Sequence, residues 1–263
     1  MGISKKYKLT DETIQVGDIT LHRIEALMNF SNVYKGEKGG FVESEDNLSH
    51  NGDCWVYGTA KVCGNARVVD NAKVGGNAEV YGNASIYGDA LIYGNAEVFG
   101  NAKVRNEAKV RDDVVICGNA RVYDNARVYD NARVYNNAII SDKAMVSDRA
   151  VVCGNAEVFG NAIIYGDVIV YDNAEVYNNA RIYGYAFVYG DAEVCGNAVV
   201  YGDAKVHGNA VVRDNAEVYG CARVCNDAEV CDNAELFDNA IVCGDVKVYG
   251  NAVICGNTKV CDD

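Results

Sequence analysis

Few side chains in this sequence could carry chemistry. The chain has 263 residues with three histidines, His22, His50 and His207, and only His207 lies in its repetitive part. A catalytic zinc needs about three protein ligands that converge on one point. The sequence also has no phosphate-binding loop, no Gly-x-Gly-x-x-Gly after a predicted strand and no Cys-x-x-Cys pair. We therefore predict no metal and no cofactor, and only His207 is a candidate catalytic base.

The eleven cysteines follow the rhythm of the repeat. Their odd number, and a start (MGISKKYKLTDETIQ) without an apolar export signal, favour reduced thiols in a cytoplasm. Cys225, Cys243 and Cys261 are 18 residues apart and should form a column below His207. We expect small thiols there, because neighbours in a parallel sheet look poorly aimed for a disulfide, and a metal or redox site with His207 is the alternative. All cysteines except Cys54 are predicted to be accessible to solvent.

A six-residue rhythm must position these side chains. Every sixth residue from Val56 to Val260 is Val, Ile or Leu, and the residue two before it is small, nearly always Ala. Residues six apart would lie on rotating faces of a helix, whereas residues two apart on a strand share a face. Gly-Asn, Gly-Asp and Asp-Asn pairs, which tolerate positive φ, stand between these segments. Each hexad is therefore predicted to be a short strand and a corner, with Ala and Val facing inward.

This pattern resembles the left-handed parallel β-helix of the hexapeptide-repeat superfamily, in which three hexads make one triangular coil. The resemblance implies an all-β triangular prism of about 11.5 coils of 18 residues over residues 54–263. The family usually has Gly directly after the aliphatic residue, where this chain has Tyr or Cys. Residues 7–60, above all Gly39-Gly40-Phe41-Val42 and Gly52-Asp53-Cys54-Trp55, are similar to the N-terminal segment of YdcK-type transferase-like proteins and their phage and prophage relatives.

Residues 1–53 are predicted to form a small β cap. We expect short strands around Lys6 to Leu9, Thr13 to Val16 and Ile19 to Leu27, with a turn at Gly17-Asp18. A Gly-rich turn should then lead into the first coil. A solenoid needs such a cover over the open end of its core.

The residues next to each inward aliphatic residue should point outward and carry any binding function. The tyrosines among them are expected to stack in columns that stabilise the sheets. One side gathers a contiguous apolar patch, which is typical of an interface. We predict self-association either through the uncovered coil at the C-terminal end or through this patch. The patch comprises Val115, Cys117, Tyr135, Val151, Cys153, Ile169, Tyr171, Phe187 and Tyr189.

The charge limits the partners. A net charge of −13 disfavours direct binding to nucleic acid or to an anionic membrane, and no apolar run is long enough to span a bilayer. We favour a non-enzymatic structural or protein-binding module of bacterial or phage origin, in a bacterial or phage-infected cytoplasm, whose rigid faces bind a protein or a second copy. The resemblance implies an alternative, an acyltransferase with His207 as general base. A third hypothesis is an acidic phage-encoded inhibitor of a host nucleic-acid-binding protein.

Overall fold

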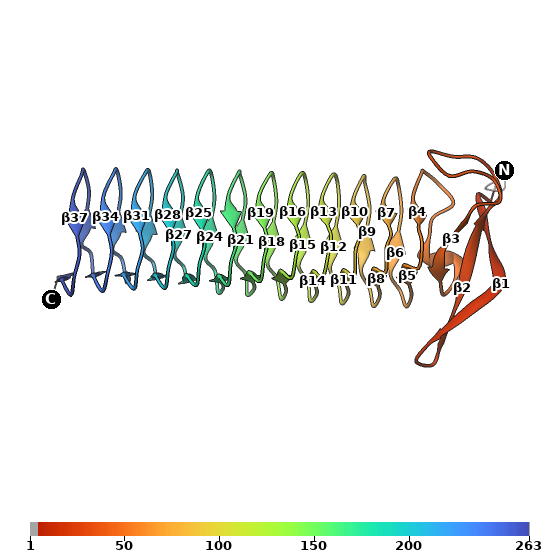
Figure 1. Cartoon of the computed structure of the whole chain (residues 1–263), viewed down its shortest axis with the longest axis horizontal. Helices are drawn as coiled ribbons and strands as arrows, with labels where there is room; N and C mark the ends of the chain where they lie inside the picture. Colours follow the sequence, from red (N-terminus) through yellow and green to blue (C-terminus); the bar gives the residue numbers. More distant parts are fainter. Residues whose placement is uncertain (1–4, 263) are drawn as a thin grey trace. The chain divides into compact units, whose positions relative to one another are not determined.

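The computed structural model describes residues 5–262 and shows an all-β protein (Figure 1). The chain divides into two compact units, residues 1–129 and 130–263. One short 3₁₀ helix, η1 (Glu45–Asn47), interrupts the strands of the described part. In each unit three parallel sheets form the three sides of a triangular coil. The predicted fold class, a parallel β-helix with a small β cap, is confirmed. Among the described residues no helix has the length and apolar character needed to cross a membrane.

In unit 1 each hexad contributes one two-residue strand, and strands 18 residues apart pair in register. Sheet 1 contains β5 (Lys61–Val62), β8 (Glu79–Val80), β11 (Glu97–Val98) and β14 (Val115–Ile116). Sheet 2 contains β6 (Arg67–Val68), β9 (Ser85–Ile86), β12 (Lys103–Val104) and β15 (Arg121–Val122). Sheet 3 contains β4 (Trp55–Val56), β7 (Lys73–Val74), β10 (Leu91–Ile92), β13 (Lys109–Val110) and β16 (Arg127–Val128).

Unit 2 repeats this arrangement. Its sheet 1 contains β17 (Arg133–Val134), β20 (Val151–Val152), β23 (Ile169–Val170), β26 (Phe187–Gly190), β29 (Lys205–Gly208), β32 (Arg223–Val224), β35 (Ile241–Cys243) and β38 (Lys259–Cys261). Sheet 2 contains β18 (Ile139–Ile140), β21 (Glu157–Val158), β24 (Glu175–Val176), β27 (Glu193–Val194), β30 (Val211–Val212), β33 (Glu229–Val230) and β36 (Lys247–Val248). Sheet 3 contains β19 (Met145–Val146), β22 (Ile163–Ile164), β25 (Arg181–Ile182), β28 (Val199–Val200), β31 (Glu217–Val218), β34 (Glu235–Leu236) and β37 (Val253–Ile254).

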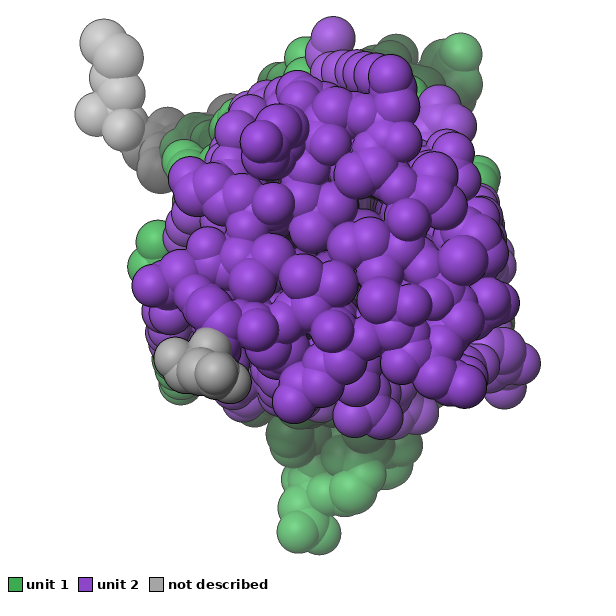
Figure 2. All heavy atoms as spheres, turned by 90° about the vertical axis from the view of Figure 1, so that its left-hand side faces the viewer, with its two compact units in different colours: residues 1–129 green, residues 130–263 purple. Residues whose placement is uncertain are grey.

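The core lies inside the coils, where the inward Ala and aliphatic positions meet. Val176 and Ala174 are fully buried, as are Val114 and Val168, which replace the usual Ala. Figure 2 shows unit 2 from one end, where its atoms fill the face turned to the viewer. Burying one such aliphatic side chain contributes about 1.5–3 kcal/mol, so the repeated inward pair is the main source of stability. The predicted inward register is confirmed.

The corners use a left-handed backbone conformation, as the Gly, Asn and Asp residues predict. Asp172 and Asn178 have φ near +60°, a region that Asn and Asp occupy more readily than other non-Gly residues. Corner carboxylates also bind the next coil: Asp148 Oδ2 accepts a hydrogen bond of 2.9 Å from the backbone N–H of Gly166. Corner amides continue as ladders, in which Asn179 Nδ2 donates to Asn197 Oδ1 at 3.1 Å. Each coil is therefore tied to the next at its corners and along its strands.

The N-terminal cap is a hairpin joined to the first coils. β1 (Tyr7–Val16) and β2 (Ile19–Ala26) are antiparallel around the predicted Gly17-Asp18 turn. The two short strands expected before that turn form one strand with a register shift between Leu9 and Thr13. β3 (Lys38–Val42) pairs antiparallel with β2 and parallel with β5, so it connects the hairpin to the solenoid.

Gly39 and Gly40, which carry part of the sequence resemblance, lie in β3. A Cβ atom on Gly39 would come within 2.5 Å of the Val56 carbonyl oxygen, and one on Gly40 within 2.5 Å of the Ala60 carbonyl oxygen. These glycines are therefore required by close packing of β3 on the first coil.

Candidate binding face and cysteine column

Sheet 1 of unit 2 holds most of the residues predicted to have a function. The residue before each inward aliphatic residue and the residue after it form two outward columns. The first column is Arg133, Val151, Ile169, Phe187, Lys205, Arg223, Ile241 and Lys259. The second is Tyr135, Cys153, Tyr171, Tyr189, His207, Cys225, Cys243 and Cys261. The predicted site residue Val115 lies in unit 1, on β14, where it pairs with Glu97.

Three strands of this sheet carry an uncharged row. Val151, Ile169 and Phe187 pair in register on β20, β23 and β26, and all three side chains are half-buried. Beside the row, the rings of Tyr171 and Tyr189 stack with centroids 4.8 Å apart. The six outward positions of these strands hold no charge, so the surface is flat, apolar and partly open to solvent.

His207 continues the aromatic column on β29. Its ring stacks on Tyr189 with centroids 4.7 Å apart. Partial burial lowers the pKa of His207, and the nearby Arg223 and Lys205 cations lower it further. The imidazole is therefore neutral at neutral pH and able to accept a proton.

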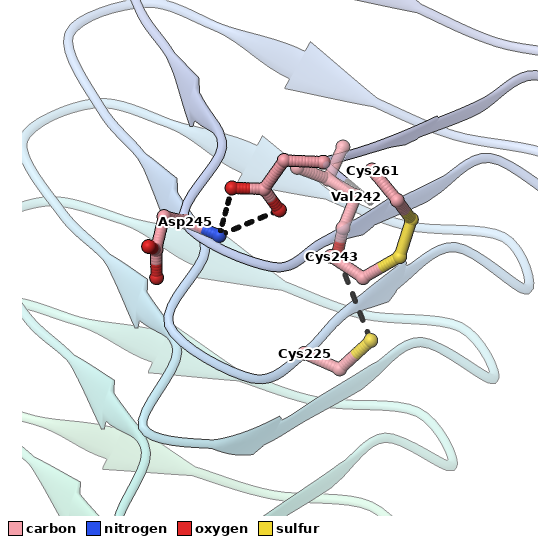
Figure 3. The surroundings of a disulfide bond; sticks show 6 residues. Cys225, Val242, Cys243, Asp245 and Cys261 are labelled. Carbon is pink, nitrogen blue, oxygen red and sulfur yellow. Dashed lines mark hydrogen bonds between the residues drawn. A yellow bond between two sulfur atoms is a disulfide. The ribbon is translucent and has the colours of Figure 1, made fainter.

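The next three positions of the column contain a disulfide. Cys243 and Cys261 are bonded, with Cα atoms 4.6 Å apart, and Cys225 is a free thiol (Figure 3). Our prediction of reduced thiols is wrong for this pair, since in-register neighbours in a parallel sheet fall within the Cα separation that a disulfide accepts. The backbone N–H of Asp245 donates to both carboxylate oxygens of Asp262, at 2.9 Å each, and ties the end of β38 to the coil before it.

Two further cysteines do not match the predicted exposure. Cys195 is 8% exposed and Cys231 is 6% exposed, so both are buried. They occupy outward positions of sheet 2, in the column that also holds Tyr177 and Arg213. Long side chains 18 residues away cover a short thiol, which the inward and outward pattern alone does not reveal. Cys54 is fully buried, as predicted.

Sheet 3 of unit 2 carries the longest aromatic column. Its five rings are parallel, with centroids 4.8–5.0 Å apart between neighbours. The predicted stacking is confirmed, and it stabilises the sheet without placing a reactive group. The column comprises Tyr165, Tyr183, Tyr201, Tyr219 and Phe237.

Sequence reasoning missed an acidic ladder on sheet 2. Glu157, Glu175 and Glu193 pair in register on consecutive strands. Burial raises the pKa of the Glu175 carboxyl, and the charges of Glu193 and Glu157 raise it further. Tyr177 relieves part of this repulsion because its hydroxyl donates to Glu193 Oε2 at 2.9 Å. The signal that could have found the ladder is Ala-Glu-Val recurring at every third hexad.

One cluster in the described part of the chain has the residue types of a metal site. Asp214, Cys231 and Asp232 bring an oxygen, a sulfur and an oxygen within 4.8 Å of one another. The Asp214 carboxylate already accepts a hydrogen bond of 2.7 Å from Arg213, and burial raises the pKa of the Cys231 thiol. A cation and a protonated thiol both oppose metal binding, so we assign no metal to this cluster.

Unit 1 contains an apolar cavity of about 250 Å³ between the β1–β2 hairpin and the first coils. Val16, Ile19 and Leu21 line it from the hairpin, and Cys63 and Tyr81 line it from sheet 1. It is smaller than most small-molecule sites, which begin near 300 Å³. No candidate residue from the sequence lies in it.

Comparisons with known proteins agree with the fold. Residues 126–142 match the family model described as YdcK beta solenoid repeat. The predicted resemblance to YdcK-type proteins is thereby supported within the repeats, whereas the motifs quoted above lie in residues 7–60. No curated protein sequence matches the chain.

Two of the solved structures that match this chain are acyltransferases. UDP-N-acetylglucosamine acyltransferase of Arabidopsis is 13% identical to this chain. The match covers 65% of this chain and 67% of that one, with a TM-score of 0.36. UDP-N-acetylglucosamine acyltransferase of Francisella novicida is 14% identical to this chain. The match covers 69% of this chain and 60% of that one, with a TM-score of 0.23. This chain thus spans less than two thirds of the Francisella enzyme. At these identities and scores the likenesses say nothing about a substrate of this chain.

Proposed function

We propose that this chain is a protein-binding solenoid that docks through sheet 1 of unit 2, with a second copy of the chain as its partner. The observation that supports this is the uncharged row of Val151, Ile169 and Phe187 on three consecutive strands. Contiguous apolar patches rimmed by polar residues are typical of interaction sites. Arg133 and Lys205 limit the row at its two ends.

The face is rigid before it binds. The backbone N–H of Ile169 donates to the Ala186 carbonyl at 3.1 Å, and that of Tyr171 donates to the Val188 carbonyl at 3.0 Å. A surface held in this way loses little conformational entropy on association. Two flat sheets can pack face to face about 10 Å apart, and a two-fold contact closes after two copies.

The test is the mass of the protein in solution. Light scattering at micromolar concentration should give about twice the 28.3 kDa chain mass. Each copy carries a net charge of −13, so added salt should strengthen association by screening the repulsion. A mass near that of one chain, at low and at high salt, would refute the proposal.

A matched pair of variants locates the contact. Phe187→Glu places a charge in the row and should return the protein to a monomer. Val199→Glu makes the same kind of change at the equivalent outward position of sheet 3, on β28, and should leave the dimer intact. Equal effects of the two variants would exclude sheet 1 as the interface.

The second candidate function is acyl transfer with His207 as general base. The observation that favours it is a neutral imidazole with two cations nearby, Lys205 and Arg223, which would attract an anionic substrate to the base. It ranks second because the apolar cavity described above lies in unit 1, whereas His207 lies in unit 2. Acyl-CoA consumption that is lost in His207→Ala would favour this function, and consumption that is absent or unchanged would exclude it.

A further inference from the structure

A thiol lies next to a disulfide on sheet 1 of unit 2. Cys225, Cys243 and Cys261 take the same outward position after the inward aliphatic residues of β32, β35 and β38. Cys243 is bonded to Cys261, and Cys225 is free and half-buried. This arrangement concerns the chemistry of the chain and does not depend on the proposed docking function.

The three cysteines are equivalent in register. Val224 pairs with Val242 just as Val242 pairs with Val260, so Cys225 stands on one side of Cys243 as Cys261 stands on the other. The Cys225 sulfur points toward the neighbouring strand, 3.7 Å from the Val242 carbonyl oxygen (Figure 3). Cys243 therefore has a possible bonding partner on each side.

The surroundings of Cys225 supply a proton acceptor and positive charge. Lys205 pairs with Arg223 and Val206 with Val224, which places His207 opposite Cys225 on the preceding strand. Burial raises the pKa of the Cys225 thiol, while Arg223 and Lys259 oppose that shift by favouring the thiolate. Nearby cations activate a thiol for attack on a disulfide.

We propose that these three cysteines form a thiol–disulfide exchange site in which the disulfide moves along the column. His207 accepts the proton of the Cys225 thiol. The Cys225 thiolate then attacks the Cys243 sulfur, the Cys225–Cys243 bond forms and the Cys243–Cys261 bond breaks. The electron pair of the broken bond stays on the Cys261 sulfur, which takes up a proton. The bonded pair supplies the oxidising equivalents, so no outside oxidant is needed.

Serine variants test the two positions of the disulfide. In Cys261→Ser, purified without reductant, peptide mapping should find a Cys225–Cys243 disulfide. In Cys225→Ser, the matched control, it should find the Cys243–Cys261 disulfide. A Cys261→Ser protein that is folded by circular dichroism but has Cys225 and Cys243 both reduced would overturn the proposal.

The native protein tests movement between the two positions. N-ethylmaleimide should label both Cys225 and Cys261, each on molecules in which the other two cysteines are bonded, and leave Cys243 unlabelled. At low N-ethylmaleimide concentration the disulfide moves faster than the thiols are labelled, and at high concentration labelling is faster. The ratio of Cys225-labelled to Cys261-labelled protein should therefore change at the concentration where the two rates are equal. Labelling of Cys225 alone at every concentration would show a fixed disulfide and refute the exchange.

The role of His207 is tested by a variant that keeps its stacking. His207→Phe preserves a ring against Tyr189 but has no basic nitrogen. The two labelled products should remain, while the reagent concentration at which their ratio changes should fall by about tenfold or more, because general base catalysis contributes at least that much. An unchanged concentration would remove His207 from the mechanism.

Discussion

Glu175 and Glu229 occupy the same outward position of the same sheet, on β24 and β33, yet the pKa values of their carboxyl groups shift in opposite directions. Burial raises the pKa of Glu175, and neighbouring carboxylates add to the rise. Hydrogen bonds from Lys247 at 2.8 Å and from Arg213 at 2.7 Å lower the pKa of Glu229. The repeat gives both residues one backbone environment, so the side chains contributed by the neighbouring coils decide the sign of the pKa shift.

Glu175 and Glu229 should therefore contribute to folding stability with opposite dependences on pH. A carboxyl with a raised pKa stabilises the folded state below its ordinary pKa, and that contribution is lost as the pH rises through the folded value. Glu175→Gln should therefore raise Tm at pH 7, and the gain should disappear as the pH falls to about 4. Thermal unfolding followed by circular dichroism at the two pH values measures this.

Glu229→Gln is the control. Its lowered pKa contributes stability above the ordinary value, and this contribution is lost as the pH falls through the folded value. The variant should lower Tm at pH 7 and have a smaller effect at low pH. The same sign for both variants would contradict the assignment of the acidic ladder.

Stability should reside in the inward residues. Val176 is fully buried, and Val176→Asp should cost several kcal/mol because the buried charge has no partner. Tyr177→Ser removes the stacking on Phe159, at a centroid distance of 4.9 Å, and the hydrogen bond to Glu193, and should cost about 1 kcal/mol. Urea unfolding of both variants gives the comparison, and equal losses would reverse the inward and outward assignment.

The cysteines should react in an order set by burial. Cys221 and Cys255 are exposed, whereas Cys54, Cys195 and Cys231 are buried. Burial also raises the pKa values of these three buried thiols, which reduces the thiolate that reacts. Native alkylation counted by mass spectrometry should modify the first two cysteines first. Rapid labelling of Cys195 in folded protein would show that the neighbouring side chains of its column do not cover the thiol.

Two glycines separate backbone strain from crowding. Gly17 has φ +58° and open space around its Cβ direction, so Gly17→Ala should cost about 1–2 kcal/mol from conformation alone. Gly94 has φ +79°, and a Cβ atom there would lie 2.5 Å from the Asp112 backbone nitrogen. Gly94→Ala should therefore lower the free energy of unfolding by more than Gly17→Ala does. If denaturant titration gave the same loss of unfolding free energy for both variants, the coils around Gly94 would have to move apart at little cost.

The repeat could be predicted because its information is local. The Ala and Val positions, the positive φ at Asp172 and the stacking of Tyr183 on Tyr201 all follow from the residues of one hexad and its copies. The place of Gly39 in a strand depends instead on its contact with Val56 of the first coil, and Gly39 itself lies outside the six-residue repeat. The sequence therefore predicts the solenoid well and the cap only in part.

The candidate site likewise has features that the sequence predicts and features that it does not. The row of Val151, Ile169 and Phe187 was predicted from periodicity alone, because its members share one position in the hexad. The covering of Cys195 and the opposite shifts of two glutamates depend on which side chains stand one coil away. Disulfide formation between Cys243 and Cys261 depends on the aim of two side chains, which spacing did not reveal.

The in-register pairing of residues 18 apart also governs how such a gene can change length. Loss or duplication of 18 codons within unit 2 removes or adds one whole coil and returns every later residue to its own sheet. Loss of six codons between Tyr189 and His207 preserves the inward Val but moves each later residue to another sheet, so His207 would leave the column of Tyr189. The outer faces of this protein are therefore preserved only when the chain gains or loses three hexads at a time, although the core would tolerate the gain or loss of a single hexad.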